Sequence, residues 1–250
     1  KLSSLVWDES GTFWARTENG IVRHNGYTKK EFLFDPANRS QIVGQEIIGL
    51  QKTDANEIWI TYRDTCVITR LNPDTETFEH FRIDELMTDG ELTAVVVRVK
   101  KESNGQLWLC TWGSGMIRFN PKDGANKVFI LSEDGDVEGS AHFIKDMVIQ
   151  DDGRFFVTFF SGKRGHTSLP GFFDPTTEKF KSVDIEAIIK DYPEELVKQL
   201  RVAIKIIHWV HQDEYGKYWL GSYSGLLYLD IENQILKRVS EKGENKTIQN

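Results

Sequence analysis

The chain has 250 residues, of which 39% are hydrophobic and 28% are charged, and its formal net charge is −7. This hydrophobic content is enough to build a core in one or two domains. The acidic balance and the lack of a Lys- or Arg-rich run exclude a nucleic-acid-binding protein, which needs a basic surface. No apolar run has the length of a membrane-spanning helix.

A signature of four residues recurs five times along the chain. It consists of Gly, any residue, an apolar residue and an aromatic residue, which is usually Trp. Its copies lie at residues 11–14, 56–59 (with Asn in place of Gly), 105–108, 153–156 (with Phe in place of Trp) and 216–219. The first four copies are spaced by about 45–50 residues, which is a period typical of propeller repeats.

Four short strands are predicted in each repeat. The first strand precedes the signature, at residues 4–7, 47–51, 95–99, 144–149 and 204–210. The second strand contains the signature aromatic residue. A third strand follows a tight Gly-containing turn, and a fourth follows a turn of the Asn-Pro or Asp-Pro type. Turns of this composition supply positive φ angles at low cost.

This organisation predicts an all-β fold, a β-propeller of five four-stranded repeats. The repeats are expected at residues 1–43, 44–91, 92–140, 141–202 and 203–250, within a single propeller domain or segment that covers 1–250. One four-stranded sheet cannot bury both of its faces alone, whereas radially stacked sheets bury them against each other. The favoured interpretation is a segment of a larger, seven-bladed propeller, and the alternative is a small closed ring.

The fourth repeat carries an insertion at residues 184–201. Apolar residues such as Ile185, Ile188 and Leu196 recur there at spacings that suit an amphipathic helix. Pro193 interrupts the pattern, which predicts one or two short helices. We expect these helices to be a packed addition to the propeller, and the alternative is a lid or a docking element.

A search for catalytic and metal-binding patterns predicts no catalytic residue, no metal and no cofactor. His208 and His211 are expected on opposite faces of one strand, which favours structural roles. The acidic stretch at residues 134–138 lacks the full calcium-binding loop and is predicted to be a solvated connection. Cys66 and Cys110 lack metal-like spacing, so buried reduced thiols are favoured and a disulfide between them stays open.

The third repeat has the most complete motif, Asn-Gly-Gln-Leu-Trp-Leu-Cys-Thr-Trp-Gly-Ser-Gly-Met-Ile-Arg-Phe-Asn-Pro at residues 104–121. This motif resembles the two-component regulator propeller repeat. Residues 8–23 and 213–229 follow the pattern well, with Ser222 in place of Thr. The second repeat departs from it with Tyr62 in place of Thr, and the fourth with Phe156 in place of Trp.

In that family, such repeats form the extracytoplasmic sensor regions of bacterial hybrid two-component histidine kinases. Many of these receptors respond to products of polysaccharide breakdown. The resemblance therefore implies a non-catalytic sensor segment that recognises an oligosaccharide and signals to transcription. It also implies a location in the periplasmic portion of an inner-membrane receptor. The implied partners are the ligand, further propeller blades and the signalling domains of the same receptor, with a homodimer as an option.

The candidate ligand site is expected where loops vary while the framework repeats. The residues four positions after the signature aromatics are Glu18, Arg63, Trp112, Phe160 and Tyr223. Trp112 and Tyr223 can stack on a sugar ring. Arg63 can bind hydroxyl groups, carboxylates or sulfates, as can Arg164 and His166 in the loop of the fourth repeat. The alternative is ordinary variation of exposed loops.

Two other functions remain open from the sequence. One is a scaffold, protein-interaction or dimerisation module, which the helical insertion favours. The other is a propeller lyase or hydrolase that acts on glycans. This second alternative rests on the fold and on scattered His, Arg and Tyr residues, and a fold alone does not specify a function.

Overall fold

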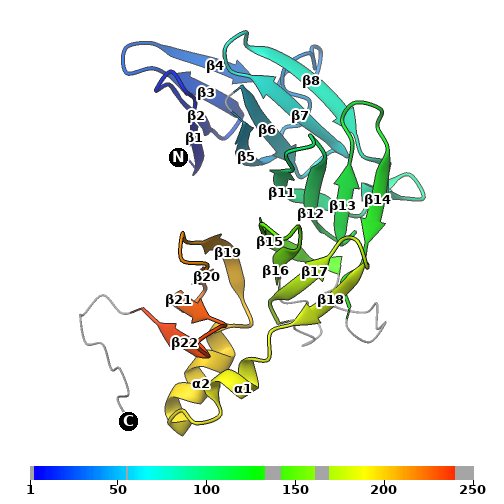
Figure 1. The fold of residues 1–250 in the computed structure, drawn as a ribbon. Coiled ribbons are helices and arrows are strands. Elements are labelled where there is room, and N and C mark those ends of the chain that lie inside the picture. The colour runs from blue at the N-terminus through cyan, green and yellow to red at the C-terminus, as the bar shows by residue number, and fades with distance from the viewer. Residues whose placement is uncertain (1–2, 55, 133–141, 161–168, 240–250) are drawn as a thin grey trace. The chain divides into compact units, whose positions relative to one another are not determined.

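The computed structural model describes residues 3–54, 56–132, 142–160 and 169–239. It contains five four-stranded antiparallel sheets and one two-stranded sheet, and each four-stranded sheet follows the order of the chain (Figure 1). We call the four-stranded sheets blades 1 to 5. The prediction of an all-β fold of five four-stranded repeats is therefore confirmed.

The chain forms two compact units, of which the first is Lys1–Ile130. Its strands are β1 (Ser3–Trp7), β2 (Phe13–Arg16), β3 (Gly20–His24) and β4 (Lys29–Leu33) in blade 1, β5 (Ile47–Asp54), β6 (Glu57–Tyr62), β7 (Val67–Asn72) and β8 (Thr77–Arg82) in blade 2, and β11 (Val95–Lys101), β12 (Leu107–Trp112), β13 (Met116–Phe119) and β14 (Asn126–Phe129) in blade 3. A short 3-10 helix, η1 (Asp84–Leu86), and the hairpin of β9 (Met87–Thr88) and β10 (Glu91–Leu92) connect blades 2 and 3.

The second unit is Leu131–Asn250. Its elements are β15 (Ile144–Ile149), β16 (Phe155–Phe159), β17 (Gly171–Asp174) and β18 (Lys179–Ser182) in blade 4, the helices α1 (Ile185–Ile189) and α2 (Glu194–Ala203), and β19 (Ile207–Gln212), β20 (Tyr218–Ser222), β21 (Gly225–Asp230) and β22 (Ile235–Arg238) in blade 5. The two predicted helices are confirmed, with the break at Pro193. The strand predicted at residues 204–210 begins later, because Ile204 caps the C-terminus of α2 through its N–H bond to the Leu200 carbonyl.

The signature aromatic residue packs between neighbouring blades within each unit. Trp14 of blade 1 belongs to a buried cluster with Ile47 and Ile58 of blade 2. Trp59 of blade 2 lies in another cluster with Val96 and other apolar residues of blade 3. Within the described clusters, the aromatic residue therefore joins its blade to the following one.

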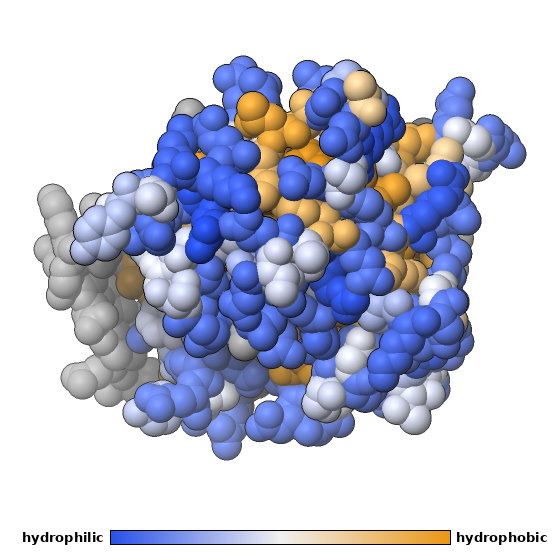
Figure 2. Space-filling view, turned by 90° about the horizontal axis from the view of Figure 1, so that it is seen from above, coloured by the Kyte–Doolittle hydropathy of each residue, from blue (hydrophilic) through white to orange (hydrophobic). Residues whose placement is uncertain are grey.

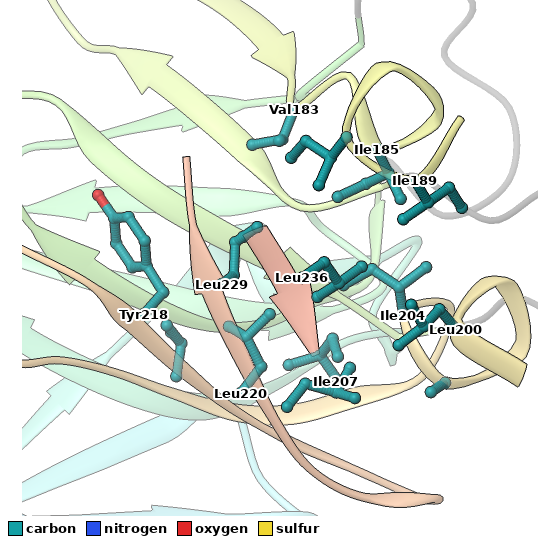
Figure 3. Packing of buried hydrophobic residues seen from close by; sticks show 14 of the residues in the cluster. Val183, Ile185, Ile189, Leu200, Ile204, Ile207, Tyr218, Leu220, Leu229 and Leu236 are labelled. Atoms are coloured by element: carbon teal, nitrogen blue, oxygen red, sulfur yellow. The ribbon is translucent and has the colours of Figure 1, made fainter. Parts of the chain in front are cut away.

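In the second unit, Phe156 of blade 4 stacks on Tyr218 of blade 5 with ring centroids 4.0 Å apart. The same cluster includes Ile189 and Leu200 from the two helices and Leu236 from β22 (Figure 3). The apolar faces of both helices are thus used for packing against blade 5. This packing supports the interpretation of the insertion as a packed addition.

The first strand of each blade carries an irregularity near its start, at the same position in blades 2 to 5 and one residue nearer the signature aromatic in blade 1. The pairing registers shift between Ser3 and Leu5, Ile47 and Gly49, Val96 and Arg98, Ile144 and Asp146, and Ile207 and Trp209. One additional residue lies in each shift: Ser4, Ile48, Val97, Lys145 and His208. Such a bulge leaves a residue outside the strand ladder and changes the direction of its side chain.

Polar and apolar surfaces are mixed in the described part of the chain. Figure 2 shows one face on which hydrophilic residues predominate and apolar residues lie in patches between them. Leu5, Trp7 and Leu33 of blade 1 are among the exposed apolar residues. Cys66 and Cys110 are both buried thiols without a disulfide. Among the described residues, no helix has the length and hydropathy needed to span a membrane.

Candidate functional site

Each blade has two ends, which carry different connections between strands. One end carries the two hairpin turns, β1–β2 and β3–β4 in blade 1 and their counterparts elsewhere, and we call it the hairpin end. The other end carries the turn between the second and third strands and the chain segment that enters the first strand. We call it the connector end. The predicted site residues Arg63, Trp112 and Tyr223 lie at the connector ends of their blades.

The structure brings Arg63 and Trp112 together, although they come from different blades. Arg63 directly follows β6 of blade 2, and Trp112 is the last residue of β12 in blade 3. The Arg63 guanidinium carbon lies 5.9 Å from the centroid of the Trp112 ring, which is within the range of a cation–π contact. The Arg63 side chain is 54% exposed and its Nε lies 3.6 Å from Glu46 Oε2. A solvent-facing cation thus lies beside an aromatic ring.

The turn after Trp112 is fixed by contacts with the connection between blades 2 and 3. Gly113 has a φ of +115°, and a Cβ at this position would lie 2.6 Å from the Thr93 carbonyl oxygen. The Ser114 hydroxyl donates a 2.8 Å hydrogen bond to the Glu85 carbonyl oxygen. These contacts pack the turn after Trp112 closely against the connection between blades 2 and 3.

Glu85 is a residue of this region that the sequence did not indicate. Its carboxylate oxygen Oε2 is buried and has no protein hydrogen-bond partner in the described structure. A buried carboxylate oxygen without a donor is costly, and an internal water molecule can satisfy it. Glu85 lies in a connection outside the repeat, so no comparison between repeats could have found it.

The other predicted site residues lie in the second unit. Tyr223 directly follows β20 and is 83% exposed, and its backbone N–H donates to the Ile206 carbonyl at 3.2 Å. Its ring is therefore available at the connector end of blade 5. Arg164 and His166 lie outside the described residues, as does the acidic stretch at 134–138.

A second group of polar and aromatic residues occurs at the connector ends of blades 4 and 5. Lys145 Nζ lies 5.7 Å from the centroid of the Phe160 ring. Partial burial of His208, with a further contribution from the positive charge of Lys145, lowers the pKa of the His208 imidazole below 6.5. Phe160 is among the variable positions found in the sequence. Lys145 and His208 were overlooked as site residues, because the bulges of β15 and β19 are not visible in the sequence pattern.

Two grooves lie away from these groups. At the hairpin end of blade 2, an open groove of about 570 Å³ is lined by residues that include Glu57, Arg70 and Lys101. Lys101 and Arg70 both pair with Glu57, so cations and carboxylates bind one another in this groove. A smaller, more apolar groove of about 340 Å³ follows α2 beside Leu196 and Val202.

A search of the described residues for metal ligands found no group of three or more His, Cys, Asp or Glu side chains that could hold a metal ion. Within β19, the bulge leaves His208 partly buried, whereas His211 is exposed and pairs in the ladder with Trp219. The arrangement at the connector ends offers aromatic faces, cations and hydrogen-bonding groups, which are the components of a binding site for a polar ligand.

No family model matches the sequence, and no curated protein matches it. Solved structures do match. The extracellular domain of BT3049, assigned to a hybrid two-component system of B. thetaiotaomicron, has a TM-score of 0.67 and 14% identity, over 94% of this chain and 29% of that one. Virginiamycin B lyase from Staphylococcus aureus has a TM-score of 0.63 and 14% identity, over 97% of this chain and 71% of that one.

PorZ, a bacterial surface component of the type-IX secretion system of Porphyromonas gingivalis, has a TM-score of 0.62 and 13% identity, over 96% of this chain and 34% of that one. The chain thus spans less than a third of the BT3049 domain. The similar structures include extracellular domains of two-component systems as well as a lyase, so they share an architecture and not one function. Its five four-stranded sheets are the blades of a β-propeller.

Proposed function

We propose that this chain is a ligand-binding segment of the extracytoplasmic sensor region of a bacterial two-component receptor, and that it recognises an oligosaccharide. The contact between Arg63 and Trp112 is the observation that carries the proposal. It places an exposed cation next to an aromatic ring at the junction of two blades, where the repeat does not constrain the residue type. An aromatic face suits the C–H groups of a sugar ring, and a guanidinium group donates hydrogen bonds to hydroxyl groups or carboxylates.

Two further observations support a sensor role. The connection beside Ser114 also holds a buried polar group, the Glu85 carboxylate, whose Oε2 has no protein partner in the described structure. The extracellular domains of proteins assigned to two-component systems share the fold of this chain. In the proposed receptor, the chain is periplasmic, and membrane and kinase domains of the same protein transmit the signal.

A thermal-shift screen of the chain against neutral, uronic-acid and sulfated oligosaccharides tests the proposal. A ligand at 100 times its Kd stabilises the native state by about 2.7 kcal/mol. This corresponds to a Tm increase of roughly 5–10 °C, at about 2–4 °C per kcal/mol for a chain of this size. We expect one sugar class to give such a shift, and Trp112→Ala and Arg63→Ala to remove it.

Tyr27→Ala is the matched control, because Tyr27 is a 96% exposed aromatic residue in the β3–β4 turn, at the hairpin end of blade 1. This variant should keep the full shift. Trp112→Phe should keep part of it, which separates loss of the aromatic face from loss of folding. A shift that is equal in the Trp112→Ala, Arg63→Ala and Tyr27→Ala variants would refute the assigned site.

The screen also separates binding from catalysis. A sensor segment should leave every oligosaccharide intact, and a glycan lyase or hydrolase should convert one. Chromatography of the sugars after prolonged incubation with the chain measures this difference. Appearance of a shortened or unsaturated product would contradict the non-catalytic role.

A further inference from the structure

The bulges of β15 and β19 place two basic residues at equivalent positions of neighbouring blades. The pairing register of β15 skips Lys145, and that of β19 skips His208. Both residues lie at the connector end of the second unit, where each strand begins. Because a bulged residue is released from the strand ladder, its side chain can be directed toward a ligand instead of into the sheet.

Lys145 and His208 lie near the start of two neighbouring strands, since the Val210 N–H of β19 donates to the Asp146 carboxylate of β15. Together with partial burial, the Lys145 charge makes protonation of His208 less favourable. The neighbouring carboxylate of Asp146 accepts the backbone N–H groups of Met147 (2.9 Å) and Val210 (3.2 Å). An anionic group of a ligand placed beside both side chains would interact favourably with the Lys145 ammonium group and would favour protonation of the His208 imidazole.

Aromatic residues flank the two basic side chains. Phe160 directly follows β16, and the Lys145 ammonium group lies over its ring at 5.7 Å. Tyr223 directly follows β20 at the equivalent position of blade 5, and its side chain is largely exposed. Each blade therefore contributes one basic side chain and one aromatic ring at the same end. This combination suits a ring-shaped ligand that carries a negative charge.

We propose that Lys145, His208, Phe160 and Tyr223 form a subsite for an acidic sugar, in which a carboxylate or sulfate group binds the two basic side chains and the sugar ring packs on the aromatic residues. This inference rests on the proposed recognition of an oligosaccharide, and it adds the chemical class of the ligand. It concerns the second unit and is independent of the site at Arg63 and Trp112.

An NMR titration of the imidazole signals tests this subsite directly. The probes are D-glucuronate with D-glucose as its neutral counterpart, and N-acetylglucosamine 6-sulfate with N-acetylglucosamine. The signal that disappears in His208→Gln is assigned to His208. With an acidic probe, this signal should move and the pKa of His208 should rise, whereas the neutral counterparts should leave both unchanged.

Two pairs of variants define the binding groups. Lys145→Gln should weaken glucuronate binding by roughly tenfold, because a charge-assisted contact is lost, whereas Lys179→Gln removes an exposed lysine at the hairpin end of blade 4 and should leave the affinity unchanged. Tyr223→Ala should also weaken binding. Tyr215→Ala should have no effect, since Tyr215 is an exposed tyrosine in the β19–β20 turn at the opposite end of blade 5.

The outcomes distinguish this inference from the proposed function. If no probe moves the His208 signal while an oligosaccharide still gives a Trp112-dependent thermal shift, the acidic subsite is wrong and the sensor proposal stands. If inorganic sulfate replaces glucuronate fully and the variants of Phe160 and Tyr223 have no effect, the assignment to a sugar is wrong. If His208 responds to glucuronate and the Trp112→Ala variant loses nothing, the subsite stands and the site at Arg63 and Trp112 is wrong.

Discussion

At the scale of single residues, the signature Trp explains why an acidic residue lies six positions before it. The indole N–H of the Trp donates a hydrogen bond to that carboxylate. Trp14 donates to Asp8 at 2.9 Å, Trp108 to Glu102 at 2.8 Å, and Trp219 to Asp213 at 2.9 Å. In blade 2 the corresponding residue is Thr53, and the Trp59 indole nitrogen is buried without a partner in the described structure. The carboxylate therefore lets a bulky ring be buried without loss of its polar group.

Removal of this acceptor should destabilise the first unit. Burial alone would raise the pKa of Asp8, but hydrogen bonds from Ser10, Trp14 and Thr12 outweigh burial and lower it. Asp8→Ala leaves these donors unsatisfied, which should cost about 1–3 kcal/mol. Urea unfolding followed by Trp fluorescence measures the loss. Glu18→Ala, which changes an exposed acidic residue near the β2–β3 turn, should change stability little, and an equal loss in both variants would contradict the role of the indole bond.

His208 gives a prediction about pH. Its native pKa is lowered by partial burial and by Lys145, so the unfolded chain binds the proton more readily than the native protein. The contribution of His208 to stability is therefore complete above about pH 6.5 and is lost as the pH falls through the lower native pKa.

Urea unfolding at pH 7.5 and pH 5 checks this expectation. The wild-type chain should lose more stability between the two conditions than His208→Gln. All other titratable groups are shared by the two proteins, so the difference isolates His208. Identical losses would show that the imidazole has the same pKa in the native and unfolded states.

At the scale of elements, the turn between the second and third strands shows why the repeat keeps a hydroxyl residue and a Gly. The Thr111 hydroxyl donates to the Gly115 carbonyl at 2.7 Å and accepts the Ser114 N–H at 3.0 Å. Ser222 does the same for Gly225 and Ser224 in blade 5. The hydroxyl group thus bridges a backbone N–H and a backbone carbonyl of the same turn, as in other Ser and Thr turn motifs.

Two glycines of blade 3 allow the cost of a left-handed backbone conformation to be measured apart from the cost of a steric clash. Gly115 and Gly124 have φ angles of +68° and +76°, but a Cβ at Gly115 would lie 2.4 Å from the Phe129 carbonyl oxygen, whereas one at Gly124 has open space. Gly124→Ala should cost about 1–2 kcal/mol for the left-handed conformation. Gly115→Ala should cost clearly more, because the backbone of β14 must also move. Chemical denaturation of both variants measures the difference, and equal costs would contradict the close approach of β14 to the turn before β13.

The sequence predicted some elements and overlooked others for identifiable reasons. The strand repeat and the break at Pro193 were visible because periodicity and proline act locally. The hairpin of β9 and β10 was overlooked, although Asp89-Gly90 at its turn is a common hairpin dipeptide. Tyr62 departs from the repeat, and its hydroxyl donates to Thr69 Oγ1 at 3.0 Å instead of closing a turn. Burial raises the pKa of Tyr62 to about 12.

At the scale of the whole molecule, polar side chains connect the first strands of neighbouring blades, which are far apart in sequence. The Ser4 hydroxyl accepts the Leu50 N–H at 3.0 Å, which links blades 1 and 2. Asp146 accepts the Val210 N–H at 3.2 Å and links blades 4 and 5. In both cases the donor N–H belongs to the first strand of the following blade, two residues after the bulged residue of that strand. Such long-range pairs, and the meeting of Arg63 with Trp112, depend on how blades stack, so the sequence alone could not predict them.

Loss of the Asp146 carboxylate should weaken the connection between blades 4 and 5. Asp146 is buried, and Asp146→Ala leaves the Val210 and Met147 N–H groups without this acceptor. We expect a loss of about 1–3 kcal/mol. Hydrogen exchange should show faster exchange of the Val210 amide than in the wild type. Asp191→Ala, a change of an exposed residue in the insertion, is the control, and unchanged exchange at Val210 would contradict this connection.

The repeated bulge also bears on how such a protein can change what it recognises. Ile48, Val97, Lys145 and His208 occupy one structural position in blades 2 to 5 but differ in size, polarity and charge. Since none of them takes part in the strand ladder, a substitution there alters the chemistry at the connector end while the hydrogen bonds of the sheet remain. In the proposed subsite, exchange of a single residue at such a position would change the ligand while the sheet keeps its hydrogen bonds.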